Sequence, residues 1–114
     1  MSYSQETGAR SREIADEILR QLGGRQFLTM TGAHNLVALG TFLAFRLPGR
    51  GRYNYVQIEL TPMDTYDVTF SKWNFNSYEK IRETKLYDVY WDQLVELFEE
   101  RTGLYTTLYP RKKI

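Results

Sequence analysis

The sequence predicts a two-layer α+β domain, in which an antiparallel meander of four to five strands packs against an N-terminal and a C-terminal helix. An amphipathic helical stripe opens the chain, runs of alternating apolar and polar residues follow, and a second amphipathic helix lies near the end. With 114 residues, 42% of them hydrophobic, the chain has the size and composition of one globular domain. We expect that domain over residues 11–109, between a frayed segment at 1–10 and a basic tail at 110–114.

The first helix is predicted to begin at Ser11, whose hydroxyl suits an N-cap, and to end at Gly23 and Gly24. Its apolar residues recur at spacings of three and four, so they form one stripe that faces the core. The stripe consists of Ile14, Ala15, Ile18, Leu19 and Leu22.

Five runs are candidate strands, at residues 26–31, 41–47, 54–61, 65–72 and 78–86. Clean alternation in the central runs leaves one face polar, which is typical of an antiparallel sheet covered on one side. The last run is polar on both faces except for Ile81, as expected of an edge strand, and it could also pair in a homodimer. Turn residues separate the runs at 48–49, 62–64 and 74–77. Residues 32–40 fit either a loop or a single helical turn.

The second helix is predicted over residues 89–102, with Asp88 as its N-cap and Gly103 as its stop. Leu104 is expected to fold back onto Phe98 beyond that stop. The predicted buried face of this helix consists of Tyr90, Trp91, Leu94, Leu97 and Phe98.

The near-neutral net charge of +1 hides an uneven distribution. No acidic residue lies between Glu17 and Glu59, and the densest basic stretch is residues 46–55. Glycines let a backbone approach phosphates, arginines bind them bidentately and tyrosines stack on bases, so this stretch is a candidate nucleic-acid contact. The alternative is a hairpin loop with solvated arginines. The candidate contact residues are Arg46, Arg50, Arg52, Tyr53 and Tyr55.

Acidic residues gather on the second helix, where they form either a solvated face or a surface that mimics phosphate charge toward a basic partner. The residues of that candidate face are Asp92, Glu96, Glu99 and Glu100.

Tyrosine makes up 9 of the 17 aromatic residues, and it suits both binding surfaces and half-buried sheet positions. We expect three tyrosines at the core or its edge, namely Tyr66, Tyr87 and Tyr90. Five are better surface candidates, namely Tyr53, Tyr55, Tyr78, Tyr105 and Tyr109.

Little in the sequence indicates catalysis. Zero cysteines and one histidine exclude thiolate and multi-histidine sites, so we expect no metal or other cofactor. The strongest enzymatic pattern places Asp64 ahead of Glu83 and Lys85, a loose match to a magnesium-dependent nuclease signature in which carboxylates hold the metal and lysine steadies a water. Asp64 also suits the end of a proline turn. His34 is expected to be a loop histidine open to solvent.

Three stretches of the sequence together carry a resemblance to a known family. They are residues 25–33 (RQFLTMTGA), 60–70 (LTPMDTYDVTF) and 94–108 (LVELFEERTGLYTTL). Over residues 22–108 the chain resembles a family of small uncharacterised proteins of tailed phages, prophages and other mobile elements. The resemblance implies an accessory protein that acts in a bacterial cytoplasm. The family more often has lysine where His34 stands, and Glu83 and Lys85 are not part of its pattern.

We therefore expect a non-enzymatic accessory protein that binds nucleic acid or a nucleic-acid-handling complex. The alternative is a protein-targeted inhibitor of a bacterial defence system, of the anti-CRISPR kind, which would use the acidic face or exposed tyrosines. A magnesium-dependent nuclease is a third possibility. The N-terminus lacks the layout of a secretory signal, and the longest apolar run, residues 36–45, is half the length of a membrane span of roughly 20 residues. No membrane partner is expected.

Overall fold

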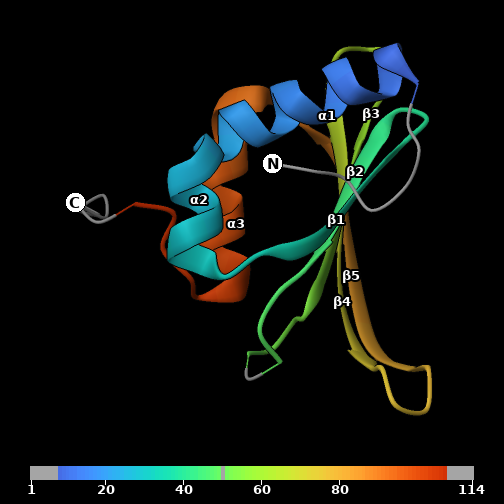
Figure 1. Cartoon of the computed structure of the whole chain (residues 1–114), viewed down its shortest axis with the longest axis vertical. Coiled ribbons are helices and arrows are strands. Elements are labelled where there is room, and N and C mark those ends of the chain that lie inside the picture. The colour runs from blue at the N-terminus through green and yellow to red at the C-terminus, as the bar shows by residue number, and fades with distance from the viewer. Residues whose placement is uncertain (1–7, 50, 108–114) are drawn as a thin grey trace.

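The structure is a computed structural model that describes residues 8–49 and 51–107, and in these residues three helices accompany a five-stranded sheet (Figure 1). A short 3-10 helix, η1, precedes the last helix. The elements are α1 (Ala9–Leu22), α2 (Gly24–Thr31), β1 (His34–Leu39), β2 (Phe42–Arg46), β3 (Tyr55–Leu60), β4 (Tyr66–Asn74), β5 (Glu79–Val89), η1 (Trp91–Gln93) and α3 (Leu94–Thr102).

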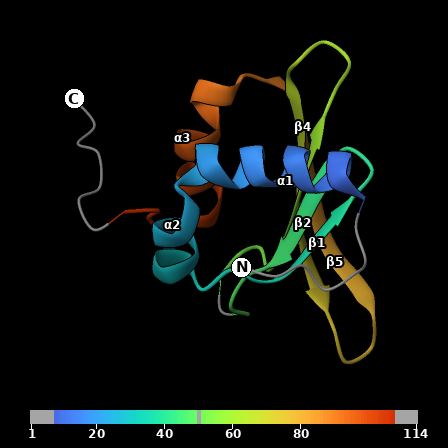
Figure 2. The same ribbon diagram turned by 45° about the horizontal axis from the view of Figure 1, so that its top comes forward.

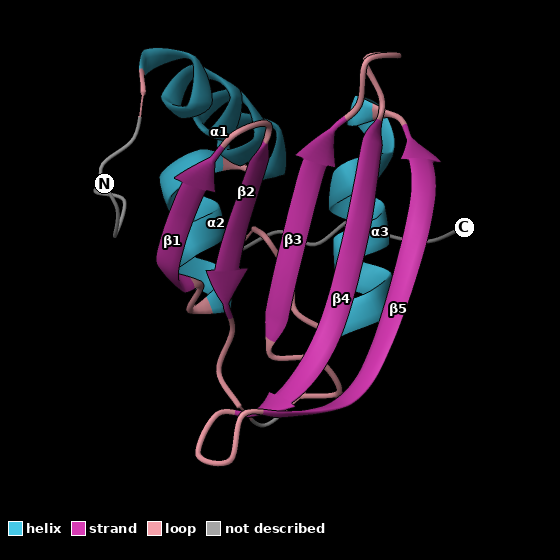
Figure 3. Cartoon of the chain, turned by 90° about the vertical axis from the view of Figure 1, so that its right-hand side faces the viewer, coloured by secondary structure: helices cyan, strands magenta, loops and turns pink. Residues whose placement is uncertain are grey.

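The sheet is an antiparallel meander with the spatial order β1-β2-β3-β4-β5. All three helices lie against one face, and no described helix covers the other face (Figure 3). The predicted α+β class is therefore confirmed, including the edge position of the run at 78–86, which becomes β5. In β3 and β4, residues Val56, Ile58, Val68 and Phe70 are buried on the helix side, as their alternation predicted.

Helix α1 confirms the predicted stripe, since all five of its apolar residues are buried. Its start differs from the prediction, because the helix begins at Ala9 with Gly8 at the N-cap, and Ser11 lies inside it. At its C-terminal end, α1 is followed directly by α2. Gly23 and Gly24 have φ values of 127° and 64°, a region that disfavours other residues, and the chain enters α2 in a new direction there (Figure 2).

Residues 26–31 are helical, so the strand predicted for them is wrong. Phe27 and Thr31, four residues apart, are the buried residues of α2, and the Thr31 hydroxyl donates to the Phe27 carbonyl oxygen at 2.7 Å. The Phe27 ring packs edge-on against Phe45 and Phe98, with centroids 5.5 and 5.1 Å away. This contact joins the sheet to both α2 and α3 and overrides the β propensity of the segment.

The stretch at 32–40 is neither the loop nor the helical turn that the sequence left open, because it contains strand β1. A register irregularity between His34 and Val37, together with a positive φ of 52° at Asn35, breaks the alternation that would identify a strand. His34 is exposed as expected, although it begins a strand, and its Nδ1 lies 2.8 Å from the Gly32 carbonyl oxygen.

The second helix starts later than predicted, because β5 continues through Asp88 to Val89. Asp88 is not an N-cap: it has a positive φ of 56°, and its carboxylate accepts from the Thr65 hydroxyl at 3.1 Å. The predictions that Tyr90 and Trp91 are buried are also wrong, since they are 58% and 62% exposed. Gly103 does end α3, with a φ of 75°, as predicted, and Leu104 packs against the core.

We expect Tyr66 to make the stability of the fold sensitive to alkaline pH. Burial raises the pKa of its hydroxyl above the usual value of about 10, although a hydrogen bond with Gln21 acts in the opposite direction. The unfolded chain then releases this proton at a lower pH than the folded chain does. The contribution of Tyr66 to the free energy of unfolding is therefore fully present below pH about 10, and it is lost as the pH rises further. Urea titrations from pH 8 to 11 should show this fall, and Tyr66→Phe should make it shallower. An equal fall in Tyr66→Phe would contradict the assignment.

Candidate nucleic-acid interface

The predicted basic loop is drawn against the β4–β5 hairpin by two basic side chains that the sequence did not single out. Lys72 Nζ donates to the carbonyl oxygens of Gly49 and Gly51, at 2.5 and 2.9 Å. Arg82 Nη1 donates to the carbonyl oxygen of Arg52 at 3.2 Å. Side chains from β2, the loop, β4 and β5 therefore meet at one end of the sheet. We call this set the basic rim: Arg46, Arg52, Lys72, Lys80 and Arg82. Arg50, also predicted as a contact, lies outside the described residues.

The prediction that Tyr53 contacts nucleic acid is wrong, because its side chain is buried. It is 4% exposed, its ring lies 5.6 Å from that of Phe70, and its hydroxyl is 2.7 Å from that of Thr84. The hydrogen bond with Thr84, with a smaller effect of Arg52, lowers the pKa of the Tyr53 hydroxyl. Because the ring is part of the core, it is not available to stack on a base.

For the other tyrosines, the predicted exposure of the side chain is confirmed in some cases and wrong in others. Tyr55 is half-buried opposite Arg46, and burial raises the pKa of its hydroxyl. Tyr78 and Tyr105 are exposed as predicted, and Tyr66 is buried as predicted, whereas Tyr87 is 65% exposed rather than part of the core. Tyr109 lies outside the described residues.

A hollow of about 310 Å³ opens within the basic rim. Two aromatic rings line it, and each has a rim cation above it: the Arg46 guanidinium is 3.8 Å from the centroid of Phe75, and Lys80 Nζ is 5.4 Å from the centroid of Trp73. Lys80 is also ion-paired with Glu83 at 2.7 Å. The residues that line the hollow are Gly49, Asn54, Lys72, Trp73, Asn74, Phe75, Asn76 and Ile81.

Asn54 holds the loop and the hairpin in fixed register. Its side-chain oxygen accepts from the Trp73 backbone N–H at 2.9 Å, and its side-chain nitrogen donates to the Trp73 carbonyl oxygen at 2.8 Å. The side-chain amide thus pairs with the backbone of β4 as a neighbouring strand would, at the residue just before the start of β3. Asn54 is 5% exposed, so both bonds are shielded from water and hold the Trp73 backbone in place beside the loop.

The sequence carried one signal for the missed residues. Buried positions in β4 recur at Tyr66, Val68 and Phe70, so Lys72 falls where the alternation predicts another core residue. Such a lysine needs polar partners, and it finds them in the loop carbonyls. Arg82 lies opposite Lys72 in the register, next to an irregularity where β5 has one residue more than β4.

The acidic face splits into parts with different roles. Glu99 serves the fold, because its carboxylate accepts from the backbone N–H and the hydroxyl of Thr106 at 2.9 and 3.0 Å. Glu96 and Glu100 line a groove of about 300 Å³ between α3 and the end of β5, together with Leu86, Tyr87, Asp88, Val89, Gln93 and Leu97.

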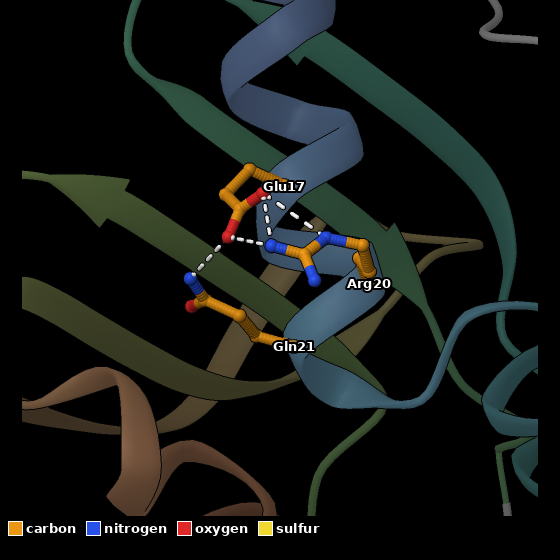
Figure 4. Close-up of polar contacts among 3 residues, drawn as sticks. All are labelled: Glu17, Arg20 and Gln21. Carbon is orange, nitrogen blue, oxygen red and sulfur yellow. Dashed lines mark hydrogen bonds and ion pairs between the residues drawn. The ribbon is translucent and has the colours of Figure 1, made fainter.

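Asp92 lines a separate groove of about 710 Å³ between α1 and η1, with Glu17, Arg20, Gln21, Trp91 and Val95. Within it, Glu17 accepts hydrogen bonds from Arg20 and from Gln21, the latter at 2.8 Å (Figure 4). These bonds, the one from Arg20 above all, lower the pKa of the Glu17 carboxyl. The charge of Arg20 is therefore satisfied within α1.

The structure does not bring the nuclease-like residues together. Asp64 is in the β3–β4 turn, near the pair Tyr66–Val89, whereas Glu83 pairs with Ser71 farther along β4. At about 3.3 Å per residue, the two carboxylates are roughly 20 Å apart along the strands. Within residues 8–49 and 51–107, no three His, Asp or Glu side chains are grouped to hold a metal ion.

Comparison of the chain with protein-family models, curated proteins and solved structures found no match. In the described part of the chain, no helix is long and apolar enough to cross a membrane.

Proposed function

We propose that the protein binds nucleic acid through the basic rim, as an accessory protein of phage or mobile-element origin without catalytic activity. The observation that supports this most is the joining of the predicted basic loop to Lys72 and Arg82. It adds two cations to Arg46 and Arg52 at this end of the sheet. Phosphate contacts from lysine and arginine supply most of the affinity of such complexes.

The expected salt dependence of binding follows from the number of phosphates that the side chains of the basic rim contact. Four to five contacts on a single strand give a slope of about −3 in a plot of log association constant against log salt concentration. Affinity then falls roughly 60-fold between 50 and 200 mM salt.

Fluorescence anisotropy with a labelled 20-nucleotide strand tests the proposal directly. We expect binding at 50 mM salt and the slope of about −3. Absence of binding at low salt both to this strand and to a duplex of the same length, or a slope near zero, would overturn it.

A second function, inhibition of a partner protein, is favoured by the opposite end of β5. Tyr87, Tyr90 and Trp91 are between 58% and 65% exposed, and exposed aromatic groups of this kind form the energetic centres of protein interfaces. The groove beside them holds Asp88, Glu96 and Glu100, so a partner surface there would be basic. Capture of a host protein that is lost in Trp91→Ala but kept in Arg52→Glu would support this function over the first.

A further inference from the structure

The hollow within the basic rim has a composition that phosphate contacts alone do not explain. Phosphate binding needs cations and backbone N–H groups, whereas this hollow is lined by Trp73, Phe75 and Ile81 as well as by asparagine amides. It is a shallow hollow of about 310 Å³ that is largely open to solvent. A flat, apolar group with polar edges suits such a lining.

We propose, on the basis of the proposed function, that the hollow receives an unpaired base and that the natural ligand is therefore single-stranded nucleic acid. A base in a duplex is stacked between its neighbours and paired at its edge, so it reaches such a hollow only at the cost of unstacking. An unpaired base has its faces and edges free to stack on aromatic rings or guanidinium planes.

The side chains around the hollow match each part of a nucleotide. Phe75 with the Arg46 guanidinium 3.8 Å above it, and Trp73 beneath Lys80, offer stacking surfaces that are partly exposed. Asn76 carries a side-chain amide, a group that pairs with base edges. Asn74 keeps only its side-chain nitrogen for such a contact, because its side-chain oxygen accepts from the backbone N–H groups of Asn76 and Ser77 at 3.0 and 3.4 Å. The Lys72 ammonium lies beside them for the phosphate, with a third N–H beyond the two that bind Gly49 and Gly51.

The backbone at Trp73 is fixed before any ligand arrives, because the Asn54 side chain binds its N–H and its carbonyl oxygen. Binding then orders few additional groups of the protein, which favours affinity. The proposal covers RNA and DNA alike.

The chain offers an internal reporter for the test. Of its two tryptophans, Trp73 lines the hollow and Trp91 lies toward the other end of β5, so Trp91→Phe leaves Trp73 as the sole tryptophan. In this background we would titrate three labelled probes, dT12, U12 and a 12-base-pair DNA duplex, and record anisotropy and tryptophan emission together. We expect both single strands to quench Trp73 and to bind at least about tenfold more tightly than the duplex.

Phe75→Ala should weaken binding of dT12 about tenfold without changing the salt slope, since it removes stacking but no cation. Tyr90→Ala, an exposed aromatic distant from the rim, is the matched control and should leave binding unchanged. Equal or tighter duplex binding, or dT12 binding without quenching of Trp73 and without an effect of Phe75→Ala, would overturn the single-strand inference while leaving the proposed function in place. Absence of binding to all three probes would instead overturn the proposed function.

Discussion

Replacing Phe27 by alanine should lower the free energy of unfolding by about 3–5 kcal/mol, the largest loss of stability that we expect from one substitution. The ring is fully buried, and it packs edge-on against Phe45 of the sheet and Phe98 of α3. Removing it opens a cavity where three elements meet. Denaturation in urea, followed by circular dichroism, measures the effect.

Thr29→Ala is the matched control, because Thr29 lies in the same helix and is exposed. It should change stability by less than about 0.5 kcal/mol. If Phe27→Ala also cost less than about 1 kcal/mol, the packing of α2 against the sheet would be contradicted, and the strand that the sequence predicts for this segment would regain support.

Reversing two charges of the basic rim, Arg52→Glu with Arg82→Glu, should weaken binding to single-stranded nucleic acid at least about tenfold at 50 mM salt. Two phosphate contacts are lost and two repulsive charges appear, so the salt slope should also become shallower by about one to two. Anisotropy titrations at several salt concentrations measure both quantities.

Arg12→Glu with Arg25→Glu changes the net charge by the same amount on exposed positions of α1 and α2. This control should weaken binding by less than about threefold, because charges beyond a Debye length of about 10 Å are largely screened at 0.1 M salt. Equal effects of the two double variants would show that net charge, rather than the rim, governs binding. Thermal melts of both variants check that the fold is intact.

Much of the fold follows from periodic patterns in the sequence. The stripe of α1 and the alternation in β3 and β4 each depend on residues that face one layer, and both predictions are confirmed. The errors occur where a local pattern competes with tertiary contacts. Phe27 turns a segment of β propensity into a helix because its ring fills the space between Phe45 and Phe98. Around Asp88, the contact with Thr65 extends β5 past the residue that resembles an N-cap.

The candidate site was predictable only in its loop. Glycines and arginines at 46–55 indicate a phosphate-binding segment, but pairing across the sheet decides which other residues join it. Lys72 and Arg82 reach the loop because the register of β4 and β5 sets them opposite each other. The burial of Tyr53 depends on Phe70 and Thr84, which are distant in the sequence, so no local pattern reveals it.

Backbone amide chemical shifts during a titration with dT12 test the central claim most directly, because they locate the contact as well as detect it. The basic rim predicts that shifted residues cluster at 46–54 and 71–83, with little change at 86–97 near the acidic groove. A cluster at 86–97, or changes spread evenly over the surface, would contradict the assignment of nucleic-acid binding to the rim.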